Sequence, residues 1–107
     1  MDFHLDFLLN LPNVTVFTCS QKSDFIIIQL AFLNAGIYCP HCQNYTDTLH
    51  QNRPILVRDL SICGLFVYLQ VPRRRFYCSH CHKAPTEHLD FVEMRRKYTI
   101  RVRRIYL

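Results

Sequence analysis

The spacing of apolar residues changes along the first third of the chain and predicts a helix followed by a hairpin. Apolar residues first recur every three or four positions, which is typical of a short amphipathic helix: Phe3, Phe7, Leu8 and Leu11. Pro12 ends this helix, and residues 14–19 then alternate as the residues of a strand do. Residues 25–32 are rich in β-branched side chains, and the polar residues 21–24 before them favour a turn. We therefore expect an antiparallel pair of strands after the helix.

The rest of the chain also favours strands. Three further strands are predicted at residues 55–60, 65–71 and 73–78. Residues 43–53 are polar and show little periodicity, so we expect a loop there. Residues 87–97 are compatible with a helix. The fold class that follows is α+β and mostly β, with antiparallel hairpins, a short N-terminal helix and a C-terminal helix.

Length and composition describe a small globular domain. The chain has 107 residues, of which 50% are hydrophobic and 20% charged, so it is neither disordered nor fibrous. A domain of this size has a limited core and often depends on a metal or a partner. The apolar stretches fall short of the ~20 residues that span a bilayer, and Asp2 and Asp6 stand where a secretory signal carries Lys or Arg. We therefore expect no membrane partner and a location in a reducing compartment, the cytoplasm.

The formal charge of +5 is unevenly distributed along the chain. Residues 1–50 contain one base and four acids, whereas residues 51–107 contain twelve bases and four acids, so the two parts carry −3 and +8. Clustered arginines favour a polyanionic partner such as DNA over a small-molecule substrate. The candidate phosphate contacts are Arg73, Arg74, Arg75, Arg95, Arg96, Arg101 and Arg103.

Four of the six cysteines form two Cys-x-x-Cys units, Cys39 with Cys42 and Cys78 with Cys81. Zn²⁺ prefers four soft ligands in a tetrahedron, and two intervening residues let a tight turn direct both thiolates at one metal. In a reducing compartment this pattern favours a metal site over disulfides. The sequence therefore predicts one structural Zn²⁺ in a zinc-ribbon-like domain, whose removal would unfold the chain. Four protein ligands leave no open coordination position, so we expect no catalysis at the metal.

Residues near these units have further interpretations. Cys19 and Cys63 lie in apolar segments, and we expect both thiols to be buried. Arg75 has the alternative role of offsetting the negative charge of the thiolates. Four neighbouring histidines are expected not to be metal ligands: His41, His50, His80 and His82.

The tetrapeptide Cys39-Pro40-His41-Cys42 also occurs in strongly oxidising enzymes of the thioredoxin class. That chemistry needs the first cysteine at the N-terminus of a helix, which lowers the pKa of its thiol. Residues 43–47 make a poor amphipathic helix, and a second Cys-x-x-Cys unit has no role in that mechanism. A thiol–disulfide oxidoreductase is therefore a minor alternative.

The order of features along the chain is specific. After the leading helix come Cys39-Pro40-His41-Cys42, His50, Arg58-Asp59-Leu60, Gly64, Arg74-Arg75-Phe76, Cys78-x2-Cys81 and Thr86-Glu87. In this order, from about residue 3 to about residue 99, the chain resembles the N-terminal zinc-binding region of the ISL-three family of bacterial insertion-sequence transposases. The Asp-Leu element and the Arg-Arg-Phe-x-Cys approach to the second unit make the resemblance specific.

The resemblance implies a module that precedes a helix-turn-helix and a DDE catalytic domain, and that helps a bacterial transposase bind the ends of its element. Eight scattered acidic residues offer no carboxylate trio for a two-metal nuclease, so we expect a truncated or partial transposase without catalysis of its own. We expect one domain with a helix and hairpin in 1–36, a zinc ribbon in 37–86 and a basic, partly helical tail in 87–107. Expected partners are DNA at transposon ends, a second copy or a full-length transposase. The alternative function is a protein-interaction or dimerisation module.

Overall fold

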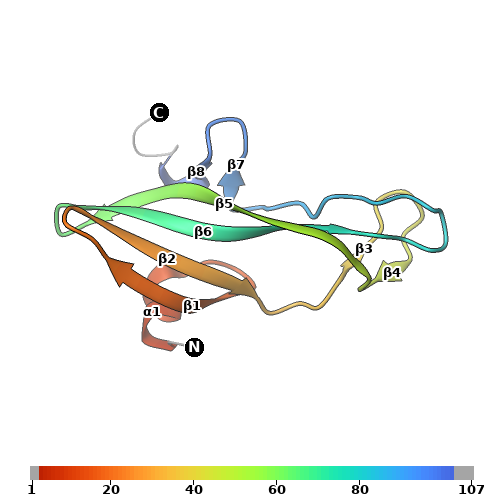
Figure 1. Ribbon diagram of the computed structural model, residues 1–107, viewed down its shortest axis with the longest axis horizontal. Helices are drawn as coiled ribbons and strands as arrows, with labels where there is room; N and C mark the ends of the chain where they lie inside the picture. Colours follow the sequence, from red (N-terminus) through yellow and green to blue (C-terminus); the bar gives the residue numbers. More distant parts are fainter. Residues whose placement is uncertain (1–2, 103–107) are drawn as a thin grey trace.

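The computed structural model describes residues 3–102 of the chain, with side chains from Asp6 to Val102. It is dominated by strands and extends 48 Å along its longest axis (Figure 1). The elements in chain order are α1 (Phe3–Leu9), β1 (Val14–Gln21), β2 (Phe25–Phe32), β3 (Ile37–Tyr38), β4 (Tyr45–Thr46), β5 (Leu49–Ile62), β6 (Leu65–Phe76), β7 (Val92–Glu93) and β8 (Tyr98–Thr99). The predicted mostly-β fold with a short leading helix is confirmed.

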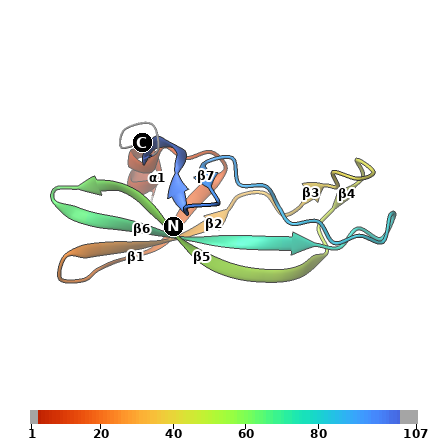
Figure 2. The same cartoon turned by 90° about the horizontal axis from the view of Figure 1, so that it is seen from above.

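Six strands form one mixed sheet in the order β1-β2-β6-β5-β8-β7, and β3 and β4 form a separate two-stranded sheet. The β1–β2, β5–β6 and β7–β8 pairs are antiparallel, as expected of hairpins. The β2–β6 and β5–β8 pairs are parallel, which the sequence did not predict. The parallel β2–β6 ladder joins the N-terminal hairpin to the long β5–β6 hairpin. The tips of both hairpins lie at the same end of the molecule (Figures 1 and 2), where the backbone N–H of Phe66 donates to the backbone carbonyl of Asp24 at 3.2 Å.

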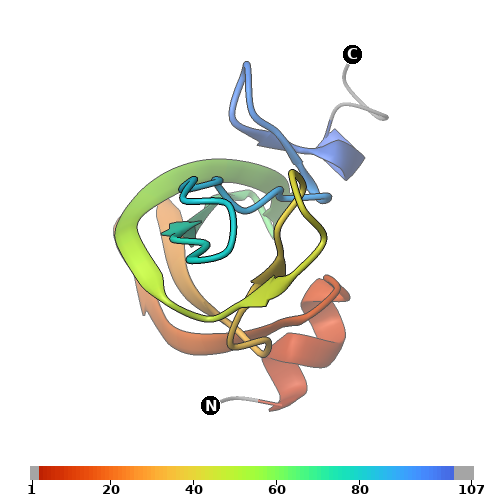
Figure 3. The ribbon, with the colours of Figure 1, turned by 90° about the vertical axis from the view of Figure 1, so that its right-hand side faces the viewer.

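The apolar core lies on one face of this sheet. Its centre consists of valine and leucine side chains on β5 and β6 that are fully buried: Val57, Val67, Leu69 and Val71. Side chains from the neighbouring elements pack against them: Leu9 at the end of α1, Val16 of β1, Ile28 of β2 and the segment 89–92. Asp6 fixes α1 onto β1, because its carboxylate accepts hydrogen bonds from the Thr15 hydroxyl and the Val16 N–H, both at 2.6 Å. Seen along the long axis, the strands curve strongly around this core (Figure 3).

The face of the β5–β6 hairpin that is buried near the core becomes exposed toward the two Cys-x-x-Cys units, and the opposite face becomes buried there. In β6 the buried positions are Val67, Leu69 and Val71, but Arg73 and Arg75, two and four residues further on the same face, are exposed. On the opposite face, the Arg74 side chain is only 12% exposed and Phe76 is buried. Each strand side chain alternates between faces, so this change of burial decides which arginines reach solvent.

The tip of the β5–β6 hairpin is a two-residue turn. Ile62 pairs with Leu65, and the residues between them, Cys63 and Gly64, have φ angles of 48° and 78°. Positive φ at both positions is the signature of a type I′ turn, which matches the twist of the flanking strands. Gly64 adopts this conformation without steric cost, whereas Cys63 does not.

Several sequence expectations are wrong in detail. The segment 43–53 is not a loop, because it contains β4 and the start of β5. The segment 87–97 is not helical: it forms β7 and a turn, and the helical residues described after it are Ile100 to Val102. In the first segment β4 pairs with β3 and the start of β5 pairs with the far end of β6, and in the second β7 pairs with β8.

The structure shows which residue of the first helix is buried, and it overturns the expected burial of Cys19 and Cys63. Phe7 and Leu8 of α1 are 84% and 73% exposed, and Leu9 is the buried residue of this helix. Cys19 and Cys63 are both exposed, because Cys19 lies in the outer half of an edge strand and Cys63 in a hairpin turn. Within residues 3–102, no helix has the length and apolar character needed to cross a membrane.

Candidate metal centre

The two Cys-x-x-Cys units lie at the end of the molecule opposite the hairpin tips. The first follows β3, and the second follows β6 by way of Tyr77. Figure 1 shows β3, β4 and the turn after β6 together at this end, beyond the sheet core. The strand β6 therefore delivers the second unit, and the short β3–β4 pair presents the first.

The backbone of the two units is nearly the same. The N–H groups of Gln43 and His82 donate to the carbonyls of Cys39 and Cys78, at 2.7 and 2.8 Å. The N–H of each first cysteine donates in turn to the backbone carbonyl of the residue five positions later, Asn44 or Lys83, at 2.8 Å. Gln43 and His82 both have positive φ angles, 62° and 60°. Two turns with the same hydrogen bonds and the same left-handed residue thus point their sulfurs at a common centre.

The four sulfur atoms form a compact cluster, with all separations within 4.8 Å. The two short separations both join the units, Cys39 Sγ to Cys81 Sγ at 3.6 Å and Cys42 Sγ to Cys78 Sγ at 3.5 Å. A disulfide requires a sulfur–sulfur distance near ~2.05 Å, and all six cysteines are free. A tetrahedral metal with metal–sulfur bonds of about 2.3 Å places its sulfurs about 3.8 Å apart. The cluster therefore has the dimensions of a metal site.

Burial and hydrogen bonding perturb two of these thiols in opposite directions. The side chain and the backbone N–H of Asn44 lower the pKa of the Cys42 thiol from 9.0 to about 6. Burial raises the pKa of the Cys81 thiol to about 12 in the metal-free protein. Cys39 and Cys78, the first cysteine of each unit, are each 1% exposed. Four sulfurs this close together can all be thiolates only when a cation lies among them.

Direct contacts hold the two units in register. The Thr46 hydroxyl on β4 donates to the carbonyl of Tyr77 at 2.6 Å, and the Tyr77 N–H donates to the carbonyl of Thr48 at 2.8 Å. Gly36 permits the close approach of the chain before β3 to β4. A Cβ atom at Gly36 would lie 2.3 Å from the carbonyl oxygen of Thr46 and 2.9 Å from Cα of Asp47, both backbone atoms.

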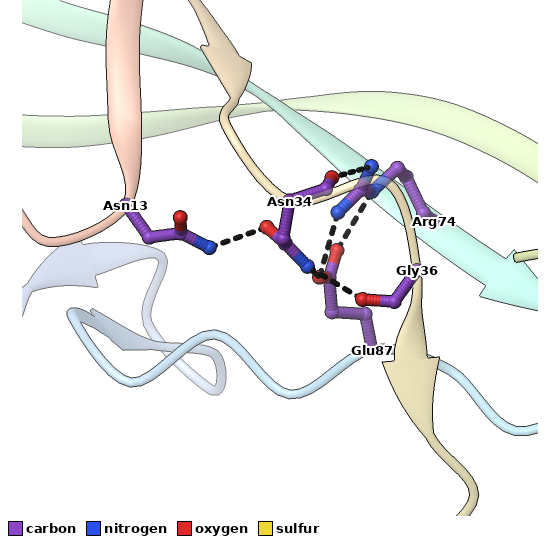
Figure 4. A network of polar contacts seen from close by, with 5 residues as sticks. All are labelled: Asn13, Asn34, Gly36, Arg74 and Glu87. Atoms are coloured by element: carbon purple, nitrogen blue, oxygen red, sulfur yellow. Dashed lines mark hydrogen bonds and ion pairs between the residues drawn. The ribbon is translucent and has the colours of Figure 1, made fainter. Parts of the chain in front are cut away.

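A buried ion pair braces the chain segments that lead into both units (Figure 4). The guanidinium of Arg74 binds the carboxylate of Glu87 through Nε at 2.9 Å and Nη2 at 2.8 Å, and it donates to the carbonyl of Asn34 at 3.0 Å. The amide of Asn34 donates to Glu87 at 3.1 Å and to the carbonyl of Gly36 at 2.8 Å, and it accepts a hydrogen bond from Asn13. This network joins the connection from β2 to β3, strand β6 and the segment after the second unit.

A second ion pair fastens the C-terminal segment to the sheet. Asp59 on β5 is buried and accepts from Arg101 Nε at 2.6 Å, from Arg101 Nη2, and from the Thr99 hydroxyl at 2.9 Å. Arg101 also donates to the carbonyl of Leu9. Arg101 thus ties the segment after β8 to the end of α1.

The structure separates the predicted arginines into two groups. Arg74 and Arg101 form internal ion pairs, so their guanidinium groups hold the fold together. The exposed candidates are Arg73, Arg75, Arg95 and Arg96, while Arg103 lies outside the described residues. The guanidinium of Arg75 donates to the carbonyl of Ala84 at 2.7 Å, beside the second unit.

The histidines are placed around the sulfur cluster without entering it. All four histidines that the sequence offered are exposed: His41, His50, His80 and His82. Among the described residues, the cluster of possible metal ligands consists of the four cysteines alone. His82 instead contacts the Tyr77 hydroxyl through Nδ1 at 3.0 Å. The tetrapeptide 39–42 lies in a turn between β3 and β4, so Cys39 lacks the helix N-terminus that oxidoreductase chemistry of the thioredoxin class requires.

Sequence reasoning missed three residues at this end of the molecule. Arg53 is exposed on β5 directly opposite Arg73, and only the β5–β6 register reveals it. Glu87 and Asn34 complete the buried network, and neither has a local sequence signal for that role. The burial of Arg74 did have one, because three successive arginines in a strand cannot share a face.

Comparison with known proteins agrees with this geometry. Residues 35–81 match the family model described as the zinc-finger of transposase IS204/IS1001/IS1096/IS1165. The matched segment contains both Cys-x-x-Cys units and the β5–β6 hairpin between them. It confirms the resemblance to this transposase zinc finger for that part of the chain. Comparisons with the curated proteins and with the solved structures found no match.

Proposed function

We propose that this protein is a zinc-stabilised DNA-binding module of an insertion-sequence transposase, which helps to hold the ends of the element and has no catalysis of its own. The observation that carries the proposal is the four-sulfur cluster within a segment similar to a transposase zinc finger. The metal identity, the DNA partner and the transposase context are inferences from that observation.

Zinc is the metal that best fits the donors. Four thiolates in a tetrahedral arrangement favour Zn²⁺ or iron, and closed four-cysteine sites joining two such turns are typical of structural zinc. The residues that would hold it are Cys39, Cys42, Cys78 and Cys81. Bound zinc supplies four metal–sulfur bonds that tie the β3–β4 turn to the end of β6. With all four positions filled by protein, the site has no place for a substrate, which supports a structural role.

The charge distribution supports DNA as the partner. The exposed arginines in the second half of the chain form no ion pair among the described residues. Arg74 and Arg101, in contrast, pair with carboxylates inside the protein. Arginine is well suited to bidentate contact with phosphate. Phosphate contacts supply most of the affinity of sequence-independent DNA binding.

Two measurements test the proposal on the full chain. Protein purified under reducing conditions should contain one zinc per chain by elemental analysis, and Cys42→Ser with Cys81→Ser should lose it. Fluorescence anisotropy with a labelled duplex of about 20 base pairs should show binding that weakens steeply with salt. Protein that holds no zinc, or that holds zinc but binds no duplex, contradicts the proposed function.

A protein-interaction module is the second candidate. Phe7 and Leu8 project from α1 with 84% and 73% of their surface exposed, and Leu56 and Phe66 on the uncovered face of the sheet are 52% and 43% exposed. Exposed apolar side chains of this size favour contact with another protein surface. Light scattering across a range of protein concentrations distinguishes this candidate, because it requires self-association that Phe7→Ser with Leu8→Ser abolishes.

A further inference from the structure

We propose that the outward face of the β5–β6 hairpin beside the metal centre, formed by Arg53, Arg73 and Arg75, is the surface that contacts the phosphates of duplex DNA. We call it the arginine face. The proposal rests on the DNA-binding function proposed above and adds where the DNA lies and in which form it is bound.

The register of the hairpin places these side chains on one face. Arg53 pairs directly with Arg73, and Gln51 pairs with Arg75. Directly opposite residues of an antiparallel pair point to the same side, and so do residues two positions apart in one strand. Arg53, Arg73 and Arg75 are all exposed. The hairpin therefore presents three arginine side chains on one face, with Gln51 as the fourth member of the face.

No described carboxylate neutralises this face. The four acids of the second half of the chain all have other contacts: Asp59 with Arg101, Glu87 with Arg74, Asp90 with His88, and Glu93 with backbone N–H groups of its own turn. The ion pairs described for residues 3–102 include none of the three arginines of the face. The carboxylates of the second half of the chain therefore have other partners, and the arginine face has no described ion pair within the protein.

The Arg53–Arg73 pair is unfavourable for folding by itself, because like charges directly opposite each other destabilise a sheet. A phosphate group placed between the two guanidinium groups removes that repulsion and adds charge-assisted hydrogen bonds. The cluster is therefore better suited to a bound anion than to the isolated chain.

Neighbouring groups already orient two of the arginines. With its amide oxygen turned toward Arg53, Gln51 accepts hydrogen bonds from Nε at 2.9 Å and Nη2 at 3.1 Å. Arg75 donates through Nε to the carbonyl of Ala84 at 2.7 Å, in the segment that follows the second cysteine unit. Fixing the side chain reduces the entropy lost on binding. The contact to Ala84 also makes the position of Arg75 dependent on an intact metal centre.

The composition of the face favours duplex over single-stranded nucleic acid. Proteins that bind single strands stack the bases on aromatic side chains between basic residues. The face consists of Gln51, Arg53, Arg73 and Arg75 and contains no aromatic side chain. Guanidinium groups without a stacking platform are suited to the phosphates of a helix whose bases remain paired.

The other exposed basic cluster is less suited to this role. Arg95, Arg96 and Lys97 lie in the turn between β7 and β8, where the carboxylate of Glu93 accepts hydrogen bonds from the N–H groups of Arg95 and Arg96 at 3.3 and 2.8 Å. That carboxylate opposes an approaching phosphate. The turn therefore provides a control cluster with the same number of positive charges.

The test compares two triple variants of the full chain that lose the same charge: Arg53→Gln with Arg73→Gln and Arg75→Gln, and Arg95→Gln with Arg96→Gln and Lys97→Gln. Affinity for a labelled duplex of about 20 base pairs is measured from about 50 to about 200 mM salt. Loss of three phosphate contacts lowers the slope of log K against log salt by about 2.7, and affinity at 0.1 M salt by roughly 500-fold. The control variant should keep a slope within about 1 of the parent protein.

A single variant separates folding from binding. Arg73→Glu converts the repulsive pair with Arg53 into an attractive one, so thermal stability should stay equal or rise while duplex affinity falls at least about tenfold. Equal losses in both triple variants overturn the proposal, because they show that only net charge matters. Tighter binding of a single strand of the same length also overturns it. If the parent protein binds no duplex, the proposed function itself is refuted. If the parent protein binds duplex and the arginine-face triple variant binds it equally tightly, only this inference is refuted.

Discussion

The buried Arg74–Glu87 pair allows the effect of removing one carboxylate to be predicted. The two side chains are 12% and 8% exposed and are joined by contacts of 2.8 and 2.9 Å. Glu87→Ala leaves the guanidinium over the rings of Phe32 and Phe76, at 4.7 and 5.0 Å from their centroids, with the Asn34 carbonyl as its remaining acceptor. Breaking a buried pair from one side costs about 3–5 kcal/mol, because the other charge stays buried without its partner.

This cost is a large share of the stability of a small domain, which is about 5–15 kcal/mol in total. We expect Glu87→Ala to lower Tm by roughly 10–20 °C. The double variant Arg74→Met with Glu87→Leu should be more stable than Glu87→Ala alone, because no buried charge remains and the methionine side chain can still pack against the two rings. Since the network also holds Asn34 and Gly36 before the first cysteine unit, Glu87→Ala should weaken metal binding as well.

The assay is urea unfolding of the metal-loaded protein followed by circular dichroism, with the slope of free energy against urea compared among variants. Asp90→Ala is the matched control, because Asp90 pairs with His88 on the surface and both side chains are 84% exposed. We expect its free energy of unfolding to change by no more than about 0.5 kcal/mol. Equal stability of Glu87→Ala and Asp90→Ala would refute the reasoning. A double variant no more stable than Glu87→Ala would show that packing, and not the unpaired charge, causes the loss.

Three further predictions concern the turns and the metal. Gly36→Ala should cost at least about 2 kcal/mol and weaken metal binding measured by competition with a chromophoric chelator, because its Cβ would lie 2.3 Å from the backbone oxygen of Thr46; Gly64→Ala, strained only by its own φ of 78°, should leave metal affinity unchanged. Cys63→Asn should raise the free energy of unfolding by about 0.5–1 kcal/mol, because asparagine tolerates the positive φ of a type I′ turn, and an unchanged urea midpoint would contradict this. Metal affinity should fall as pH is lowered, because protons compete for the four thiolates and the pKa of the free Cys81 thiol is raised to about 12; affinity independent of pH would exclude thiolate ligation.

Local patterns in the sequence predicted the elements whose pairing is local. The alternation in 14–19 and the β-branched run 25–32 correctly indicated β1 and β2, which face each other across a short turn. The helical spacing at the N-terminus was also sufficient to indicate α1. It did not identify the buried side chain, because a seven-residue helix has too few turns to define a face, and the sheet selected Leu9 in place of Phe7 and Leu8.

Elements that depend on distant partners were missed for a physical reason. Residues 49–53 are mostly polar and show no strand periodicity, yet they are extended because the ladder to residues 73–76 of β6 satisfies their backbone groups. The segment 87–97 has a composition compatible with a helix, but β8 pairs with β5 and Asp59 holds Thr99 and Arg101. Tertiary contacts of this kind override weak local preference.

The part of the candidate site that depends on the spacing of residues within each Cys-x-x-Cys unit was predictable from the sequence. Two Cys-x-x-Cys units are sufficient to suggest a four-sulfur centre, because each turn is determined locally. The arginine face was only partly predictable. Alternation along the strand separates Arg74 from Arg73 and Arg75. Arg53 lies on the same face as Arg73 because of the β5–β6 register, and that register is shifted by one irregularity near Gln51 and another between Asp59 and Ile62. Register set by such irregularities cannot be inferred from one strand alone.

The structure also changes what metal removal should do. The apolar core cluster is drawn from β1, β2, β5, β6 and the residues around Leu9 and Leu89, and it includes none of the four clustered cysteines. Loss of the metal should therefore disorder the two turns and release Arg75, while the sheet core survives, in place of the complete unfolding expected from the sequence. Hydrogen exchange after chelation should show loss of protection at the N–H groups of Cys39 and Cys78 with retention at Val57 and Leu69. Simultaneous loss at all four amides would instead show that metal and core form one cooperative unit, and that the sheet cannot persist without the centre at its end.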